Sequence, residues 1–345
     1  MKETRRIEWI DVLKGLGIFL VVYGHITQPR SIYIYSFHVP LFFFISGYLF
    51  QMPSGQRVVD FVLKKVKNLV IPYFLFSIIT VLLRVVSLYL ENDHDWLESL
   101  KNIYLVFLGN AQNGGNDAVW FLTCLFITNL FFYFYLKIAH KRWHVITFLF
   151  FMLLFSYIDS ILLISRSIYL PWKVDVSLMA IFFFGSGYLF RPYIDIMFGV
   201  THNKYAVCLL ITLLFVMNWY SARLNIFVSG IEHVKFVSAI YGNFLLFFIS
   251  AFTGIATFVL ISKVITSRVV RYFGYNSLTV LGFHKIIIFF IGKFICPNKI
   301  LMISNLVTTF ATFLFLIPII FIFNKYIFDY LRNDRKIPNS VRSNI

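Results

Sequence analysis

The sequence predicts an all-α protein, a polytopic bundle of about ten transmembrane helices with both termini in the cytosol. Hydrophobic residues make up 59% of the 345 residues and charged residues only 13%, and the mean hydropathy is +0.80. A chain with so few polar residues cannot cover a water-soluble surface, whereas a lipid-facing exterior needs very few. The 43 Phe and 20 Tyr residues suit lipid-facing surface and interfacial belts.

Ten apolar segments are candidates for these helices, because a helix needs roughly 20 apolar residues to cross the hydrocarbon core. In chain order they are expected near residues 9–28, 34–50, 68–90, 119–138, 143–160, 174–190, 204–221, 236–261, 275–296 and 300–324. The first of them does not read as a signal peptide, since it carries Asp11 and Lys14 and no small-residue cleavage pair follows it. It is therefore expected to remain as the first span.

Basic residues support this count and set its orientation, since cytosolic loops are enriched in Lys and Arg. With both termini inside, most of the 31 Lys and Arg residues fall in predicted cytosolic segments. The long outer loop after the third span collects acidic residues instead: Glu91, Asp93, Asp95, Glu98 and Asp117. Topology thus accounts for the formal net charge of +16, and binding to nucleic acid is the weaker interpretation.

The domain organisation predicted from these spans is simple. No stretch between them is long enough to fold as a soluble domain, so residues 1–330 are expected to form one transmembrane domain and 331–345 a basic cytosolic tail. The three cysteines are far apart and odd in number. They predict neither a disulfide framework nor a metal site.

One internal echo links two of the predicted spans. Residues 42–50 read Phe-Phe-Phe-Ile-Ser-Gly-Tyr-Leu-Phe, and residues 182–190 read Phe-Phe-Phe-Gly-Ser-Gly-Tyr-Leu-Phe. One interpretation is a parallel repeat of four spans. The other, which we favour, is that Ser-Gly lets two helix backbones pack closely in a Phe-rich membrane protein.

The first span carries three ionisable side chains, Asp11, Lys14 and His25, and such residues inside a membrane are costly and usually functional. Lys14 and His25 are separated by about 20° beyond three full helical turns, so they share one face, about 16 Å apart along the axis. Asp11 lies one turn before Lys14, where it can help to keep that lysine charged. A purely structural role for this stripe is disfavoured, because two aligned burials would cost stability without return.

Further polar residues on other spans predict a shared polar cavity. His38 is expected near the outer membrane boundary at a depth close to that of His25, and the ninth span holds Asn276, Ser277 and His284. Histidine suits proton transfer near neutral pH, because its unperturbed pKa is about 6.5. A simpler interpretation of His38, as a hydrated interfacial side chain, stays open.

These residues resemble acyltransferase family 3, bacterial membrane enzymes that O-acylate sugars of surface glycans, and the opening is closest to the fucose 4-O-acetylase branch. The resemblance begins with Trp-Ile-Asp-Val-Leu-Lys-Gly and a basic residue followed after ten positions by histidine. Family members often carry arginine where this chain has Lys14, and an Arg-x-x-Arg pair where it has the basic stretch before Ile-Pro-Tyr. The matching segments are residues 9–15, 23–25, 37–48, 71–73, 120–122 and 276–284.

The resemblance implies an O-acetyltransferase of the bacterial plasma membrane. Its acyl donor would be cytosolic acetyl-CoA and its acceptor a hydroxyl of a surface or lipid-linked glycan, with glycan-assembly proteins as candidate partners and no metal. His25 would act as general base, and Lys14 with Asp11 would hold the donor's thioester end or stabilise developing charge. The other expected roles are phosphate binding by Lys64, Lys65 and Lys67, and lining of the substrate path or pore by His38, Ser46, Gly47, Trp120, Asn276, Ser277 and His284.

The main alternative is a multispan transporter or glycan flippase, because buried Lys, Asp and His also occur in ion-coupled carriers. The Gly- or Pro-broken helix pairs typical of carriers are not evident in the sequence. The spacing of Lys14 and His25 fits the acyltransferase pattern better.

Overall fold

The computed structural model describes residues 7–27, 31–53, 55, 57–90, 103–109, 116–139, 141–162, 170–197, 203–295 and 305–328. The predicted cytosolic tail, 331–345, lies outside these residues. Nearly all of the described chain is helical, and the one isolated β-bridge within it joins Lys235 to Ile240.

The helices alternate long apolar segments with short connecting ones. In chain order they are α1 (Glu8–Ile26), α2 (Ile32–Tyr48), α3 (Val58–Lys65), η1 (Val66–Val70), α4 (Ile71–Leu90), α6 (Ile103–Phe107), η3 (Asp117–Val119), α7 (Trp120–Ile138), α8 (Arg142–Leu162), η5 (Pro171–Lys173), α9 (Val174–Phe190), α10 (Ile194–Met197), α11 (Lys204–Ser229), η6 (Phe236–Ser238), α12 (Phe244–Val264), α13 (Arg268–Tyr275), α14 (Ser277–Phe290), η7 (Ile291–Ile295), α15 (Asn305–Phe323) and η9 (Asn324–Phe328).

The prediction of an all-α polytopic bundle is confirmed. By length and composition, eight helices of the described chain can cross a membrane. The pair α13 and α14, bent by 86° at Asn276, makes a ninth candidate. The remaining predicted span coincides with α2, an apolar helix of 17 residues. Each of the ten predicted ranges therefore overlaps a helix or a bent helix pair of the described chain, and the side on which the termini lie stays a prediction.

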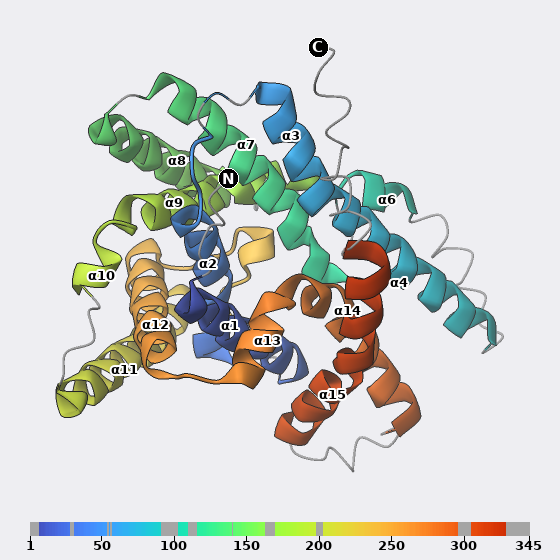
Figure 1. The fold of residues 1–345 in the computed structure, drawn as a ribbon. Helices are drawn as coiled ribbons and strands as arrows, with labels where there is room; N and C mark the ends of the chain where they lie inside the picture. Colours follow the sequence, from blue (N-terminus) through green and yellow to red (C-terminus); the bar gives the residue numbers. More distant parts are fainter. Residues whose placement is uncertain are drawn as a thin grey trace, which may run out of the picture.

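Helices α1 and α2 lie in the middle of the bundle, as Figure 1 shows, with α11 and α12 on one side and α14 and α15 on the other. Helix α2 packs along α9 through the two echoed segments. A Cβ atom on Gly47 would overlap the backbone carbonyl of Phe184, and one on Gly187 would overlap that of Phe44. The contact is reciprocal at equivalent positions of the two copies, which supports close packing as the reason for the echo.

Helix α1 meets α13 through a second reciprocal glycine contact. A Cβ atom on Gly15 would overlap the carbonyl of Val270, and one on Gly274 would overlap that of Asp11. Asp11 is buried in this contact. Because backbones approach so closely here, the start of α1, which carries Lys14, is held firmly against the bend that opens α14.

The eighth predicted span began at residue 236, but α12 begins only at Phe244. Residues 231–243, which we call the 231–243 loop, instead fold back into the bundle. Phe236 is 3% exposed, and its ring lies 5.8 Å from that of Phe43 and 6.3 Å from that of Trp120 between centroids. The apolar residues of this stretch are thus buried in protein rather than lipid, and non-helical backbone is tolerated at such a place.

Hydrogen bonds fix the shape of this loop. Lys235 and Ile240 exchange two backbone hydrogen bonds, of 2.9 and 3.2 Å. Asn225 of α11 donates to the carbonyl of Tyr241 (2.9 Å) and accepts from the backbone N–H of Asn243 (2.7 Å). Ala239 adopts a left-handed conformation with φ of 55°. The loop is therefore an ordered wall, held to α11 by the side chain of Asn225.

Candidate active site

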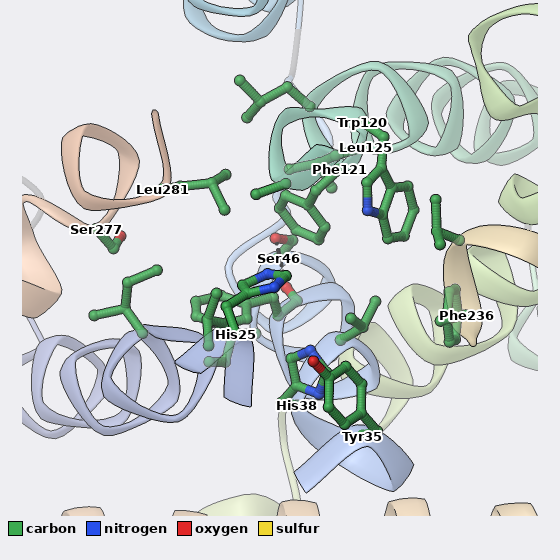
Figure 2. A pocket seen from close by; sticks show the side chains of 18 of the residues that line it. His25, Tyr35, His38, Ser46, Trp120, Phe121, Leu125, Phe236, Ser277 and Leu281 are labelled. Carbon is green, nitrogen blue, oxygen red and sulfur yellow. Dashed lines mark hydrogen bonds between the residues drawn. The ribbon is translucent and has the colours of Figure 1, made fainter. Parts of the chain in front are cut away.

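A cavity of about 640 Å³ lies among α1, α2, η1, α7, α14 and the 231–243 loop. Figure 2 shows side chains from these elements converging on it, with His25 and Ser46 in the middle, Ser277 and Leu281 on one side and Trp120 and Phe236 on the other. This volume lies in the usual range for small-molecule sites, about 300 to 1,000 Å³.

One face of α1 forms a wall of the cavity. Its lining residues are Lys14, Ile18, Val21 and His25, each separated from the next by three or four positions. That is the spacing of a single helical face. Lys14 and His25 therefore both line this one cavity.

The ring of His25 packs against that of His284 of α14, on the side away from the cavity. Their ring centroids are 5.2 Å apart. The Nδ1 atom of His284 lies 2.9 Å from the carbonyl of Val280, and a carbonyl can only accept, so Nδ1 carries a proton. His284 is completely buried and does not line the cavity. The Nδ1 atom of His25 is also buried and has no hydrogen-bond partner among the described residues.

Two further histidines, His38 and His233, contact the ring of Tyr35. The ring of Tyr35 lies 5.2 Å from that of His38 and 4.8 Å from that of His233, while its hydroxyl donates to the carbonyl of Gly24 (3.2 Å). Nδ1 of His38 donates to the carbonyl of Ile34 (2.8 Å), which leaves Nε2 as the basic nitrogen of the neutral ring. Both His38 and His233 line the cavity.

Aromatic and hydroxyl groups complete the middle of the cavity. Trp120, Phe121 and Leu125 come from the first two turns of α7. Ser46 of α2 donates its hydroxyl proton to the carbonyl of Phe42 (2.7 Å), so its oxygen remains able to accept from a ligand. The mixture of large apolar surface and a few convergent polar groups is typical of a site for an organic substrate.

The end of the cavity formed by the 231–243 loop carries charged groups. Lys235 Nζ lies 3.1 Å from Glu232 Oε2, and both side chains are solvent-exposed. The hydrogen bond from Lys235 lowers the pKa of the Glu232 carboxyl. Burial, and then Lys235, lower the pKa of His233 below its ordinary value of 6.5, while Glu232 opposes this. His233 is therefore neutral at pH 7.

The opposite end of the cavity lies beside the basic segment of α3 and η1. Asn68 and Leu69 line the cavity, directly after Lys64, Lys65 and Lys67. Lys64 and Lys67 are exposed, whereas the ammonium group of Lys65 lies 5.4 Å from the ring centroid of Phe61 and 5.9 Å from that of Phe50.

Two arginines add to this basic region. Arg191 donates to the carbonyl of Phe50 (3.4 Å), the same residue whose ring Lys65 approaches. Arg191 and Arg142 also line a second cavity of about 530 Å³, together with Tyr48 and Tyr188. Several cations therefore gather at the end of the bundle where Lys14 lies.

Comparison with known proteins decides the family. The sequence model of acyltransferase family 3, described as an acyltransferase domain, matches residues 7–325, nearly the whole chain. The chain belongs to acyltransferase family 3. No curated protein matches it, and no solved structure matches it. The matched residues lie within the predicted 1–330 domain, and the closeness to the fucose 4-O-acetylase branch stays a prediction.

The chain is therefore a multi-pass membrane acyltransferase, and six of its thirteen predicted site residues meet at one cavity. Those that line it are Lys14, His25, His38, Ser46, Trp120 and Ser277. Their roles in the reaction, and the expectation that no metal takes part, stay predictions. Within the described residues, no group of three His, Cys, Asp or Glu side chains is placed to hold a metal ion.

Three of the residues expected to line the substrate path lie elsewhere. Gly47 is covered by the backbone of α9, and His284 stands behind the ring of His25. Asn276 donates to the carbonyl of Tyr272 (2.8 Å) and accepts from Asn324 (2.9 Å), so it braces the bend between α13 and α14. Lys64, Lys65 and Lys67 lie next to the cavity rather than on its wall.

The acyltransferase also has site residues that the sequence analysis missed. Tyr35, Asn68, Glu232, His233 and Lys235 all line the cavity. Tyr35 lies three positions before His38, on the same helical face, and that spacing could have revealed it. Nothing local marks His233, because the apolar residues that follow it resemble the start of a membrane span.

Proposed function

We propose that this acyltransferase moves an acetyl group from acetyl-CoA to a sugar hydroxyl of a cell-envelope glycan. The observation that carries the proposal is a single cavity that holds Lys14 and His25 on one helical face. That cavity begins beside a cluster of basic side chains and ends at a polar loop. A two-substrate transfer needs such an arrangement, with separate approaches for donor and acceptor.

The basic end suits the donor. Acetyl-CoA carries its thioester at the end of a long arm and several phosphates at the other end, and cationic side chains are the usual partners of phosphate groups. Lys64 and Lys67 are exposed beside Asn68, where the cavity begins. In the predicted orientation this end faces the cytosol, the compartment that supplies acetyl-CoA.

The middle of the cavity suits the transfer itself. The sugar hydroxyl oxygen attacks the thioester carbonyl carbon while neutral His25 takes the hydroxyl proton. The C–S bond then breaks, an O-acetyl ester forms, and the leaving thiolate recovers the proton from His25. Lys14 is about 16 Å away along α1. It therefore holds the donor arm rather than the reacting carbonyl.

A transfer assay tests this function. The purified protein in lipid nanodiscs, supplied with labelled acetyl-CoA and a glycan extract of the cell envelope, is expected to release CoA in step with labelled glycan. In cells, mass spectrometry of the surface glycan with and without the protein should differ by acetyl units. The proposal is overturned if the wild-type protein neither consumes acetyl-CoA nor alters the glycan.

Replacing Lys14 with Gln tests the donor role. Because a hydrogen bond to a charged group is worth about 1.5 to 3 kcal/mol, the KM for acetyl-CoA should rise about 10- to 100-fold. The KM for the acceptor should stay within about twofold, and Lys14→Arg should keep much of the donor affinity. Lys293→Gln is the matched control, since Lys293 lies on η7, outside the cavity, and donates to Ser87. An unchanged KM for acetyl-CoA in Lys14→Gln would refute the assignment.

A further inference from the structure

The two ends of the cavity are chemically different. The proposed binding of acetyl-CoA explains the basic end, but it gives no role to the end formed by the 231–243 loop. Helix α1 runs from Lys14 to His25, and Tyr35 continues the same path because its hydroxyl bonds to Gly24 and its ring contacts His233. His233 thus lies beyond His25 as seen from Lys14. If the donor arm enters at Lys14 and the reaction occurs at His25, the acceptor has to approach from the side of His233.

We propose that the 231–243 loop is the acceptor-binding element of the cavity, that His233 and Glu232 hold hydroxyl groups of the sugar, and that the preferred acceptor is uncharged. The inference rests on the proposed acetyl transfer and adds to it the residues that choose the acceptor. Three observations carry it.

The first observation is the state of His233. This side chain is 9% exposed, lines the cavity, and its Nδ1 atom has no hydrogen-bond partner among the described residues. A buried polar group that lacks a hydrogen-bond partner destabilises the protein. This nitrogen has almost no accessible surface, so a sugar hydroxyl, which can both donate and accept, would become its partner when the imidazole turns toward the cavity.

The second observation is the aromatic surface next to it. Trp120 and Phe236 both line the cavity, with ring centroids 6.3 Å apart and an angle of 23° between their planes. Figure 2 shows both rings on the side of the cavity away from Ser277 and Leu281. Flat aromatic faces beside a few hydrogen-bonding groups suit a sugar ring, which presents C–H groups on its faces and hydroxyls on its edge.

The third observation is the charge balance of the loop. Glu232 is paired with Lys235 at 3.1 Å, and His233 between them in sequence is neutral at pH 7. The loop therefore offers the acceptor no uncompensated charge. The loop is also held rigidly by Asn225 and by the Lys235–Ile240 bridge, so the binding groups are in place before the acceptor arrives.

Steady-state kinetics with p-nitrophenyl hexosides as acceptor probes test this inference. In His233→Ala, the KM for the neutral hexoside should rise at least tenfold, while the KM for acetyl-CoA and the thermal shift caused by acetyl-CoA stay unchanged. The inference is overturned if the KM for acetyl-CoA and the KM for the hexoside rise equally, or if neither of them changes. If the wild-type protein shows no acetyl-CoA binding and no transfer, the proposed function itself fails, and this inference fails with it.

A second variant keeps the test independent of folding and addresses specificity. Glu232 is exposed, so Glu232→Gln should fold normally while leaving the charge of Lys235 uncompensated. We expect the ratio of kcat/KM for a p-nitrophenyl uronide to that for the neutral hexoside to rise about fivefold or more. Asp60→Asn is the matched control, since Asp60 forms an exposed pair with Arg57 at the same spacing and distance. A ratio that moves equally in both variants would contradict the role of the loop.

Discussion

His25→Ala is expected to lower kcat for acetyl transfer by a factor of about 10² to 10⁴, the usual contribution of a general base. His25 lies in the middle of the cavity, close to His38 and Tyr35 (Figure 2), and Lys14 lines the same cavity three turns earlier on α1. The measurement is the initial rate of CoA release by purified protein in nanodiscs at saturating acetyl-CoA and acceptor.

Controls separate loss of chemistry from loss of structure in this experiment. His144→Ala removes a histidine of α8 that does not line the cavity, and its rate should match that of the wild type. His25→Ala should still bind acetyl-CoA, because Lys14 and the basic segment are intact. If its kcat remains within twofold of the wild-type value, His25 is not the base, and the assignment of roles in the cavity is wrong.

The wall formed by α1 was predictable because it depends only on the helical period. Positions 14 and 25 must share a face of any straight α-helix, whatever surrounds it. His284 shows the limit of such reasoning. It lies two turns after Ser277 and therefore on the same face, but the ring of His25 occupies the space in front of it. Periodicity gives the direction of a side chain and not what fills the space beyond.

The 231–243 loop was not predictable for a different reason. Hydropathy measures how apolar a stretch is, and burial in protein needs the same residues as burial in lipid. The apolar ring of Phe236 packs against Phe43 and Trp120, and both of these residues are far from it in sequence. The acceptor end of the site therefore depends on long-range contacts, whereas the Lys14 stripe depends on local ones.

The echoed segments lead to the second large expected effect. Gly47→Ala should destabilise the bundle by about 3 kcal/mol, the upper part of the usual range for overpacking. A methyl group there would overlap the carbonyl of Phe184, which is backbone and cannot turn aside. Helices α2 and α9 would have to separate along their whole contact. The measurement is the temperature at which the detergent-solubilised protein loses its monodisperse peak. Gly292→Ala is the control, because the added methyl has no atom of the described chain beyond its own helical segment within 4 Å.

Gly187→Ala should cost about as much, since its methyl would overlap the carbonyl of Phe44 at the equivalent position. The decisive result is the double variant. Both methyl groups force apart the same two backbones, so once the helices have separated for the first, the second should add little, and the two effects should be strongly non-additive. Additive losses would mean that each glycine acts through its own surroundings, and the reciprocal contact between the two echoed segments would not be what holds α2 against α9.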